Sequence, residues 1–138
     1  MNIRRYALVF IGTSLGLWAL TMLALLVFEF DISNGGMVIL PPLVAAMIEG
    51  HRFARSNGRL PEKLEMWKFA RLAALVVMAV TMVFTVIMTF FVPELRELMA
   101  QRMGAGVLLA LVVLQALIAF LVTRFFLGFG AKSGLNER

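Results

Sequence analysis

The 138-residue sequence contains no cysteine, one histidine and few charged residues, and each shortage removes a class of protein. Without cysteine the chain forms no disulfide and has no thiolate metal site or cysteine nucleophile. With a single histidine there is no His-Glu-x-x-His metal pair, and no nucleophile–base set appears. Charged residues make up only 15% of the chain, whereas soluble domains contain about a quarter. We therefore expect a protein that is not an enzyme and binds no cofactor or metal.

Apolar residues, by contrast, make up 62% of the chain, and its mean hydropathy is +0.93. A soluble fold of this length could not hide so many apolar side chains, because small domains have a large surface for their volume. We expect an all-α integral membrane protein in which residues 1–138 form one domain. It forms a four-helix transmembrane bundle, with spans predicted at about 6–29, 35–56, 61–92 and 94–124.

The second span is the least regular, because its apolar part is short and contains two adjacent prolines. Gly35–Ile48 supplies 14 residues, or about 21 Å of helix, against a hydrocarbon core of about 30 Å. The segment becomes long enough to cross only when it continues through the polar residues up to Arg55. Pro41 and Pro42 remove two amide donors, which predicts a kink. The alternative is an ion site, because broken helices line such sites in some transporters.

Positive charge is concentrated on one side of the predicted bundle. Eleven of the thirteen Lys and Arg residues lie near the N-terminus, in residues 49–71 or in residues 124–138. The positive-inside rule then places these segments and both termini in the cytoplasm (N-in/C-in). A second segment that returned to its starting leaflet would put the basic central loop outside, so we expect four full crossings. The net charge of +5 thus reflects topology, and no basic patch with interleaved aromatics predicts nucleic-acid binding.

The densest group of ionisable residues lies at the predicted inner end of the second span, at Glu49, His51, Arg52 and Arg55. On a helix, Glu49 reaches Arg52 three residues later, and His51 shares a face with Arg55. One interpretation is a proton-sensitive or anion-binding site, since histidine titrates near neutrality and guanidinium groups bind phosphate. The interpretation that we favour is an ion-paired helix end that reaches toward water and binds anionic lipid headgroups.

Gly12 and Gly16 form a Gly-x-x-x-Gly pattern in the first span. Small residues four positions apart let another helix backbone approach closely, which gives contacts that lipid cannot match. We expect this face to pack against another helix of the same chain, and dimerisation is the alternative.

Polar side chains inside the third and fourth spans indicate a second feature. Hydroxyl groups recur every four residues and form one stripe on the third span: Thr81, Thr85 and Thr89. We expect these hydroxyls to bond to their own backbone carbonyls or across helices, with a polar pathway as the alternative. Gln115 is the one strongly polar residue of the fourth span. Its amide needs partners, so we expect it to face the bundle interior and pair with a threonine of the stripe.

Four stretches of the sequence carry a resemblance to a known group of proteins: residues 42–55, Pro61, residues 67–70 and residues 124–132. The most specific of them is the string Glu-Gly-x-Arg-Phe-Ala at 49–54. Together they resemble a family of short bacterial inner-membrane proteins with four predicted spans and no assigned function. The resemblance implies a bacterial cytoplasmic membrane and four helices. It brings no activity, ligand or catalytic residue.

The function that we predict is a non-enzymatic one, carried out through contacts within the lipid bilayer. The protein would be an accessory or assembly partner of a larger membrane complex, or would associate with itself. The alternative is a small transporter or channel, with a path lined by the second to fourth spans and gated by Glu49 and His51. An exposed small-residue face favours the first hypothesis, and a water-accessible cavity at mid-membrane favours the second. An intramembrane enzyme would instead require a cofactor-sized cavity beside His51.

Overall fold

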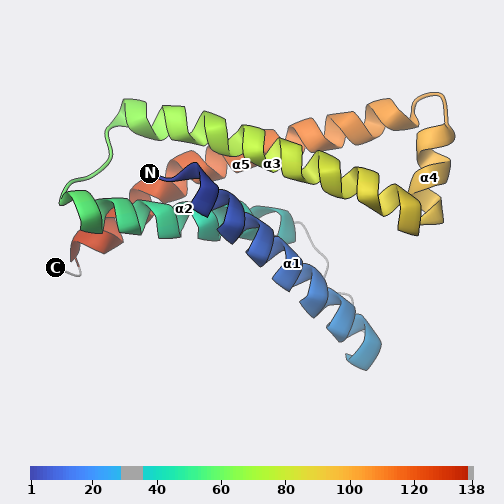
Figure 1. Ribbon diagram of the computed structural model, residues 1–138, viewed down its shortest axis with the longest axis horizontal. Coiled ribbons are helices and arrows are strands. Elements are labelled where there is room, and N and C mark those ends of the chain that lie inside the picture. The colour runs from blue at the N-terminus through green and yellow to red at the C-terminus, as the bar shows by residue number, and fades with distance from the viewer. Residues whose placement is uncertain (29–35, 137–138) are drawn as a thin grey trace.

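The computed structural model describes residues 1–28 and 36–136, and five helices lie in that part of the chain (Figure 1). They are α1 (Ile3–Phe28), α2 (Gly36–Asn57), α3 (Lys63–Phe91), α4 (Pro93–Ala100) and α5 (Gly104–Asn136). All regular structure in the described residues is helical, as predicted. Four helices, α1, α2, α3 and α5, are long and apolar enough to cross a membrane. Residues 29 and 35, which end the first and begin the second predicted span, lie outside the described residues.

Local sequence signals set the helix ends around the central connection. Gly58, just after α2, has a φ of 65°, a left-handed conformation that glycine adopts without strain. Helix α3 begins with a capping box in which the Glu62 side chain accepts a bond from the backbone at Glu65. In return the Glu62 N–H donates to the Glu65 carboxylate at 2.8 Å. Further along, Pro93 occupies the first turn of α4, where its missing N–H costs no hydrogen bond.

The fourth predicted span, 94–124, differs from the structure at both ends. The charged and apolar residues of α4 form a separate short helix, and the apolar span begins only at Gly104. A Cβ at Gly104 would overlap the Leu98 carbonyl, so the turn between α4 and α5 requires glycine there. After Arg124 the helix does not stop but continues to Asn136, because its last turns pack against α2.

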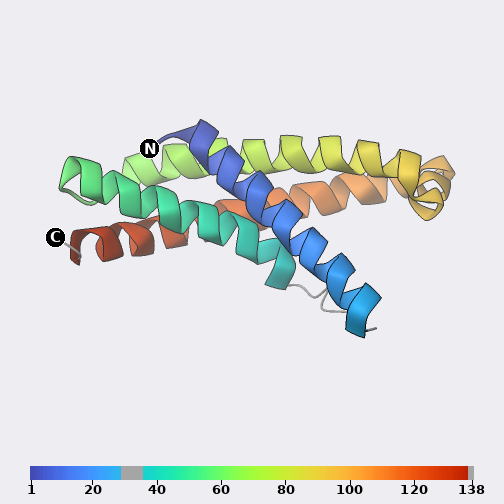
Figure 2. The ribbon, with the colours of Figure 1, turned by 60° about the horizontal axis from the view of Figure 1, so that its bottom comes forward.

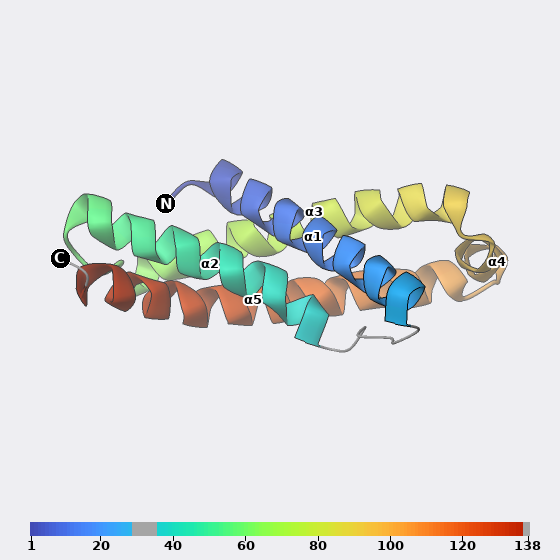
Figure 3. The ribbon, with the colours of Figure 1, turned by 90° about the horizontal axis from the view of Figure 1, so that it is seen from below.

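Helices α2, α3 and α5 run along the long axis of the molecule, and α1 crosses them obliquely (Figures 1 and 2). The N-terminus, the connection between α2 and α3, and the end of α5 lie toward one end of the molecule (Figure 3). Helix α4 lies at the opposite end (Figure 1). Helix α2 packs mainly along the C-terminal half of α5 (Figure 3). The second half of α1 diverges from the other helices (Figure 1).

The most extensive helix contact among the described residues joins α2 to α5. A Cβ on Gly50 of α2 would overlap the α5 backbone, and a Cβ on Gly130 or Gly134 of α5 would overlap the α2 backbone. Ala46 and Ala54, one turn on either side of Gly50, are fully buried. We call Gly50, Gly130 and Gly134 the glycine seam. It is the small-residue mode of packing that brings membrane helices into backbone contact.

The remaining core is small, and most apolar side chains face outward. Only 11% of the most apolar window of α1 and of α3 is buried, compared with 44% for α2. Residues such as Leu26, Phe90 and Phe125 are largely exposed. Apolar exposure of this extent is unsuited to water, and it matches helices whose outer faces contact lipid.

Candidate functional site

A buried carboxylate joins α1 to α2 near the polar end of the bundle. Glu49 is only 1% exposed, and both of its oxygens are bonded. The Arg5 side chain donates from Nε to Oε2 at 2.8 Å and from Nη2 to Oε1 at 3.0 Å. The backbone N–H of Asn2 also donates to Oε1. This two-pronged pairing of guanidinium with carboxylate fixes the start of α1 on the side of α2.

The prediction that Glu49 pairs with Arg52 is therefore wrong. Arg5 on the neighbouring helix occupies both carboxylate oxygens, and Arg52 is exposed. His51 is half-buried, and its backbone lies against Gly134 of α5, while Arg55 is exposed. Glu49 thus belongs to the contact between α1 and α2 and is separate from Arg52 and Arg55, which are exposed on α2.

At the next residue of α1, Tyr6, a second buried polar contact joins α1 to α5. The Tyr6 and Thr123 hydroxyls, both fully buried, share a hydrogen bond of 2.8 Å. The Tyr6 ring meets Phe69 of α3 edge-on, with the ring centres 5.6 Å apart. Sequence reasoning missed Arg5, Tyr6 and Thr123. The predicted topology put all three at the same depth as Glu49, but the sequence does not indicate which helices are neighbours.

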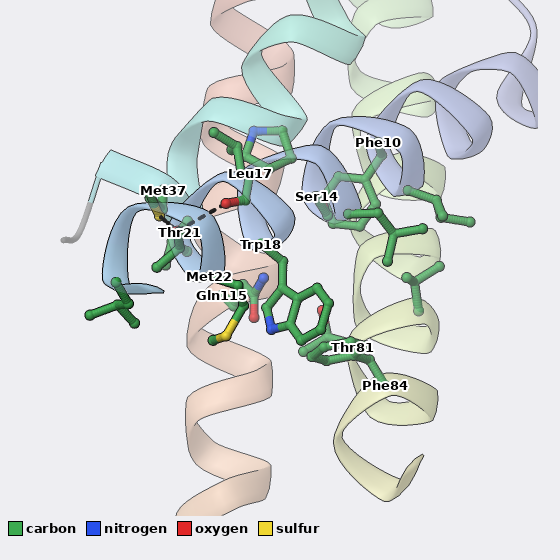
Figure 4. Close-up of a pocket in the computed structure, with 16 residues that line it drawn as sticks. Phe10, Ser14, Leu17, Trp18, Thr21, Met22, Met37, Thr81, Phe84 and Gln115 are labelled. Carbon is green, nitrogen blue, oxygen red and sulfur yellow. Dashed lines mark hydrogen bonds between the residues drawn. The ribbon is translucent and has the colours of Figure 1, made fainter. Parts of the chain in front are cut away.

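A groove of about 570 Å³ lies between α1, α2, α3 and α5, and we call it the α1 groove (Figure 4). Its walls are mostly apolar and include Phe10, Trp18 and Phe84. Four side chains add polar atoms: Ser14, Thr21, Thr81 and Gln115. The Thr21 hydroxyl is already used, since it donates to the Leu17 carbonyl at 2.9 Å. The groove is therefore suited to an apolar occupant with few hydrogen-bonding groups.

Gln115 lies near the middle of the apolar length of α5. It is nine residues before Arg124, or about 13 Å along the helix, and eleven residues after Gly104, or about 16 Å. Within residues 1–28 and 36–136 it makes no hydrogen bond to Thr81, Thr85 or Thr89, so the predicted pairing is wrong. The physical reason is that Gln115 and Thr81 both line the α1 groove, which leaves each amide or hydroxyl facing this space.

The threonine stripe does not form a continuous polar path in the described structure. Of its three residues only Thr81 lines the α1 groove. Thr89 donates to the Val86 carbonyl at 2.6 Å, which confirms for this residue the expected bond to its own backbone.

Pro41 and Pro42 lie inside a continuous α2, as its sixth and seventh residues. Both are buried, and Pro41 forms part of the wall of the α1 groove. The neighbouring residues Met37 and Val38, whose carbonyls lose their amide partners, line the same groove. The kink at these prolines stays a prediction. Among the described residues no charged side chain lines the groove beside them, so nothing in that part of the chain favours the alternative of an ion site.

Gly12 and Gly16 differ sharply from the glycine seam. A Cβ at either position would meet nothing within 4 Å among the described residues, and both glycines are exposed. The predicted packing of this face inside the chain is therefore wrong. The inner face of α1 carries Tyr6, Phe10 and the residues of the α1 groove, which turns the two glycines outward.

At the polar end of the molecule, an exposed ion pair braces the connection between α2 and α3. Arg59 donates to the two Glu65 oxygens at 3.0 and 2.9 Å, and these bonds raise the pKa of Arg59 above its ordinary value. In the described part of the chain, no group of three His, Asp or Glu residues is placed to hold a metal ion.

These features define an all-helical protein with four apolar helices of membrane-spanning length, consistent with a multi-pass membrane protein. No protein family, no curated protein and no solved structure matches the chain. The resemblance to short bacterial inner-membrane proteins thus stays a prediction, and the proposals below rest on the chain itself.

Proposed function

We propose that the protein is a multi-pass component of a bacterial cytoplasmic membrane that crosses the bilayer four times, with both termini in the cytoplasm. Two observations support this proposal. Four helices have the length and composition of membrane spans. The N-terminus, the connection between α2 and α3, and the end of α5, which carry most of the basic residues, lie toward one end of the molecule (Figure 3). Basic residues on one side are the usual mark of the cytoplasmic face.

Within that membrane, the proposed role is association with another transmembrane helix, without catalysis. The contact surface is the outer face of α1, at Gly12, Gly16 and Ala19, all of which are exposed. The observation that carries this proposal is the contrast between the two sets of glycines. The chain uses Gly50, Gly130 and Gly134 for backbone contact between helices, and it leaves Gly12 and Gly16 open toward lipid.

A second copy of the chain is the partner that we propose for this face. Two identical Gly-x-x-x-Gly faces can pack symmetrically, because each supplies the groove that the other needs. Association through α1 also leaves the internal contacts of Arg5 and Tyr6 intact, since these residues point into the molecule. An accessory role in a larger complex would use the same face for a helix of a different protein.

Oxidative cross-linking in native membranes tests this proposal, because the chain has no cysteine of its own. We expect Ala19→Cys to form a disulfide-linked dimer. A control cysteine at Leu109, on the lipid-facing side of α5, should not do so. Gly12→Leu combined with Gly16→Leu should abolish most of the cross-link. The matched control Gly106→Leu, at another open glycine, should leave it unchanged.

Persistent cross-linking in the double glycine variant would contradict the proposed interface. Absence of a cross-link at Ala19, together with a second protein purified in stoichiometric amount in mild detergent, would support an assembly role in place of self-association. If neither a dimer nor a stoichiometric partner were found, a contact role through α1 would be refuted.

The α1 groove favours a second candidate function, a small transporter or channel lined by α2, α3 and α5. In its favour, Gln115 and Thr81 bring polar groups to the middle of the bundle, in a space of about 570 Å³. Against it, no charged side chain of residues 1–28 or 36–136 lines that space. Ion or dye flux in proteoliposomes distinguishes the two functions. Transport requires flux above protein-free vesicles that Gln115→Leu reduces, whereas the contact role predicts no flux.

A further inference from the structure

A second groove lies on the outer surface of α5, toward the end of the molecule where the basic residues gather, and we call it the α5 groove. It has a volume of about 760 Å³ and is bordered on one side by Met66 of α3. Leu121 and Phe125 form its apolar part, and both are largely exposed. Arg124 and Lys132 also line it. Apolar walls and two cations are thus combined in one surface depression that lies outside the contacts between the helices.

The two cations are spaced along one ridge of α5, with a glycine between them. Arg124, Gly128 and Lys132 follow one another at intervals of four residues, so the cations are about 12 Å apart along the axis. Both side chains line the groove, and Gly128 lies between them along the helix. A Cβ on Gly128 would have only the Met66 sulfur near it, at 3.6 Å, so this position is open.

No carboxylate neutralises these cations in the described structure. Helix α5 contains no acidic residue, and neither Arg124 nor Lys132 takes part in a salt bridge within residues 1–28 and 36–136. The acidic residues at the start of α3 have other roles, since Glu65 binds Arg59 and Glu62 caps the helix. Within residues 1–28 and 36–136, this pair of cations is therefore open to an anion from a bound molecule.

Aromatic residues surround the cationic end of the groove. The Arg124 guanidinium stacks over the Trp67 ring at 4.0 Å, and Phe120 packs against the other part of that ring at 5.4 Å. Phe125, Phe126 and Phe129 continue this belt along α5. A tryptophan beside long cationic side chains is typical of the membrane–water interface.

We propose that the α5 groove binds an anionic phospholipid from the adjoining leaflet. The phosphate lies between Arg124 and Lys132 above Gly128, and one acyl chain follows Phe125 and Leu121 toward the middle of the bilayer. Charge complementarity selects this occupant, because a zwitterionic lipid carries its own cation and a soluble anion would leave the apolar half of the groove empty. The site does not depend on the proposed association through α1, which lies on a different helix.

Tryptophan fluorescence gives a direct test, because Trp67 contacts Arg124 and the chain has only one other tryptophan. In the Trp18→Phe variant, Trp67 is the sole emitter. This variant is placed in phosphatidylcholine vesicles that contain a rising fraction of phosphatidylglycerol with brominated acyl chains, which quench at contact. We expect quenching well above that given by the same fraction of brominated phosphatidylcholine.

Removing the two cations should remove this preference. We expect Arg124→Gln with Lys132→Gln to lower the apparent affinity for phosphatidylglycerol by about fivefold for each cation lost, the equivalent of about 1 kcal/mol. The matched control is Arg4→Gln with Arg71→Gln, which removes two exposed charges at the same end of the molecule. It should keep the preference. An unchanged helical circular dichroism spectrum checks that each variant is folded.

Two results would overturn the proposal. Equal quenching by anionic and zwitterionic lipids in the parent protein would mean that the groove has no charge preference. An equal loss in the control pair would mean that the attraction comes from the overall positive charge of this end and not from a site on α5.

Discussion

Placing a methyl group in the glycine seam should separate α2 from α5, and Gly130→Ala is the simplest perturbation. A Cβ at this position would lie 2.8 Å from the Cα of Met47 and closer still to its carbonyl oxygen. Ordinary contacts of a Cβ begin at about 3.4 Å, so the helices would have to move apart by more than half an ångström. The two Met47 atoms at this contact belong to the backbone, so they cannot rotate away as a flexible side chain would.

The cost of this separation can be compared with the ordinary benefit of alanine in a helix. Overpacking a close contact costs about 1–3 kcal/mol, whereas replacing glycine by alanine in an open helix gains up to about 1 kcal/mol. We therefore expect Gly130→Ala to lower the free energy of unfolding. Gly106→Ala, where a Cβ meets nothing within 4 Å, should leave it unchanged or raise it.

The assay is unfolding in mixed micelles with increasing dodecyl sulfate, followed by circular dichroism. Gly134→Ala, which also faces α2 backbone, gives a second reading of the same effect. If Gly130→Ala were as stable as Gly106→Ala, the close contact between α2 and α5 would not exist in the protein, and the continuation of α5 past Arg124 would lose its explanation.

Three further substitutions test the buried polar groups. Glu49→Gln should lower the free energy of unfolding by about 1–3 kcal/mol, because it leaves Arg5 without its buried carboxylate partner. The control Glu97→Gln, at an exposed position of α4, should have no effect. Thermal unfolding in detergent compares the two variants. Tyr6→Phe should cost about 1 kcal/mol in the same assay through loss of the bond to Thr123, and a neutral result would argue against that contact. Gln115→Leu should not destabilise the protein, since its amide makes no hydrogen bond within the described residues, and a loss of more than about 1 kcal/mol would indicate a partner that the structure lacks.

The four long helices could be predicted from composition and from the length of the apolar segments, because membrane spans are long apolar runs. The bounds of α2 and α3 came within about two residues of those predicted, since glycine, proline and a capping box mark their ends. The predicted span 94–124 ran across the break before Gly104, because the sequence left open whether the interfacial turn after Pro93 is separate from the span or joined to it. The helical tail to Asn136 was also missed, because its reason is a contact with α2 that is remote in sequence.

The candidate site was predicted less well, since its contacts depend on which helices are neighbours. Glu49 was correctly selected as a residue that needs a partner at the polar end, but the nearest arginine along the helix was chosen. In the structure the partner is Arg5, 44 positions away in the sequence. The Gly-x-x-x-Gly pattern predicts a close approach at Gly12, yet the same pattern at Gly130 and Gly134 is the one used inside the chain. A pattern of small residues indicates a possible helix contact, but it does not show which helix makes that contact.

The central claim is that the chain crosses a membrane four times and leaves its basic end in the cytoplasm. Single cysteines test it most directly, since the chain has none. We place them at Ser56, at the exposed end of α2, and at Gln101, in the exposed turn between α4 and α5. In intact cells a membrane-impermeant maleimide should label Gln101→Cys at once and Ser56→Cys only after the membrane is permeabilised. Labelling of both positions, or of neither, from the outside would contradict this topology.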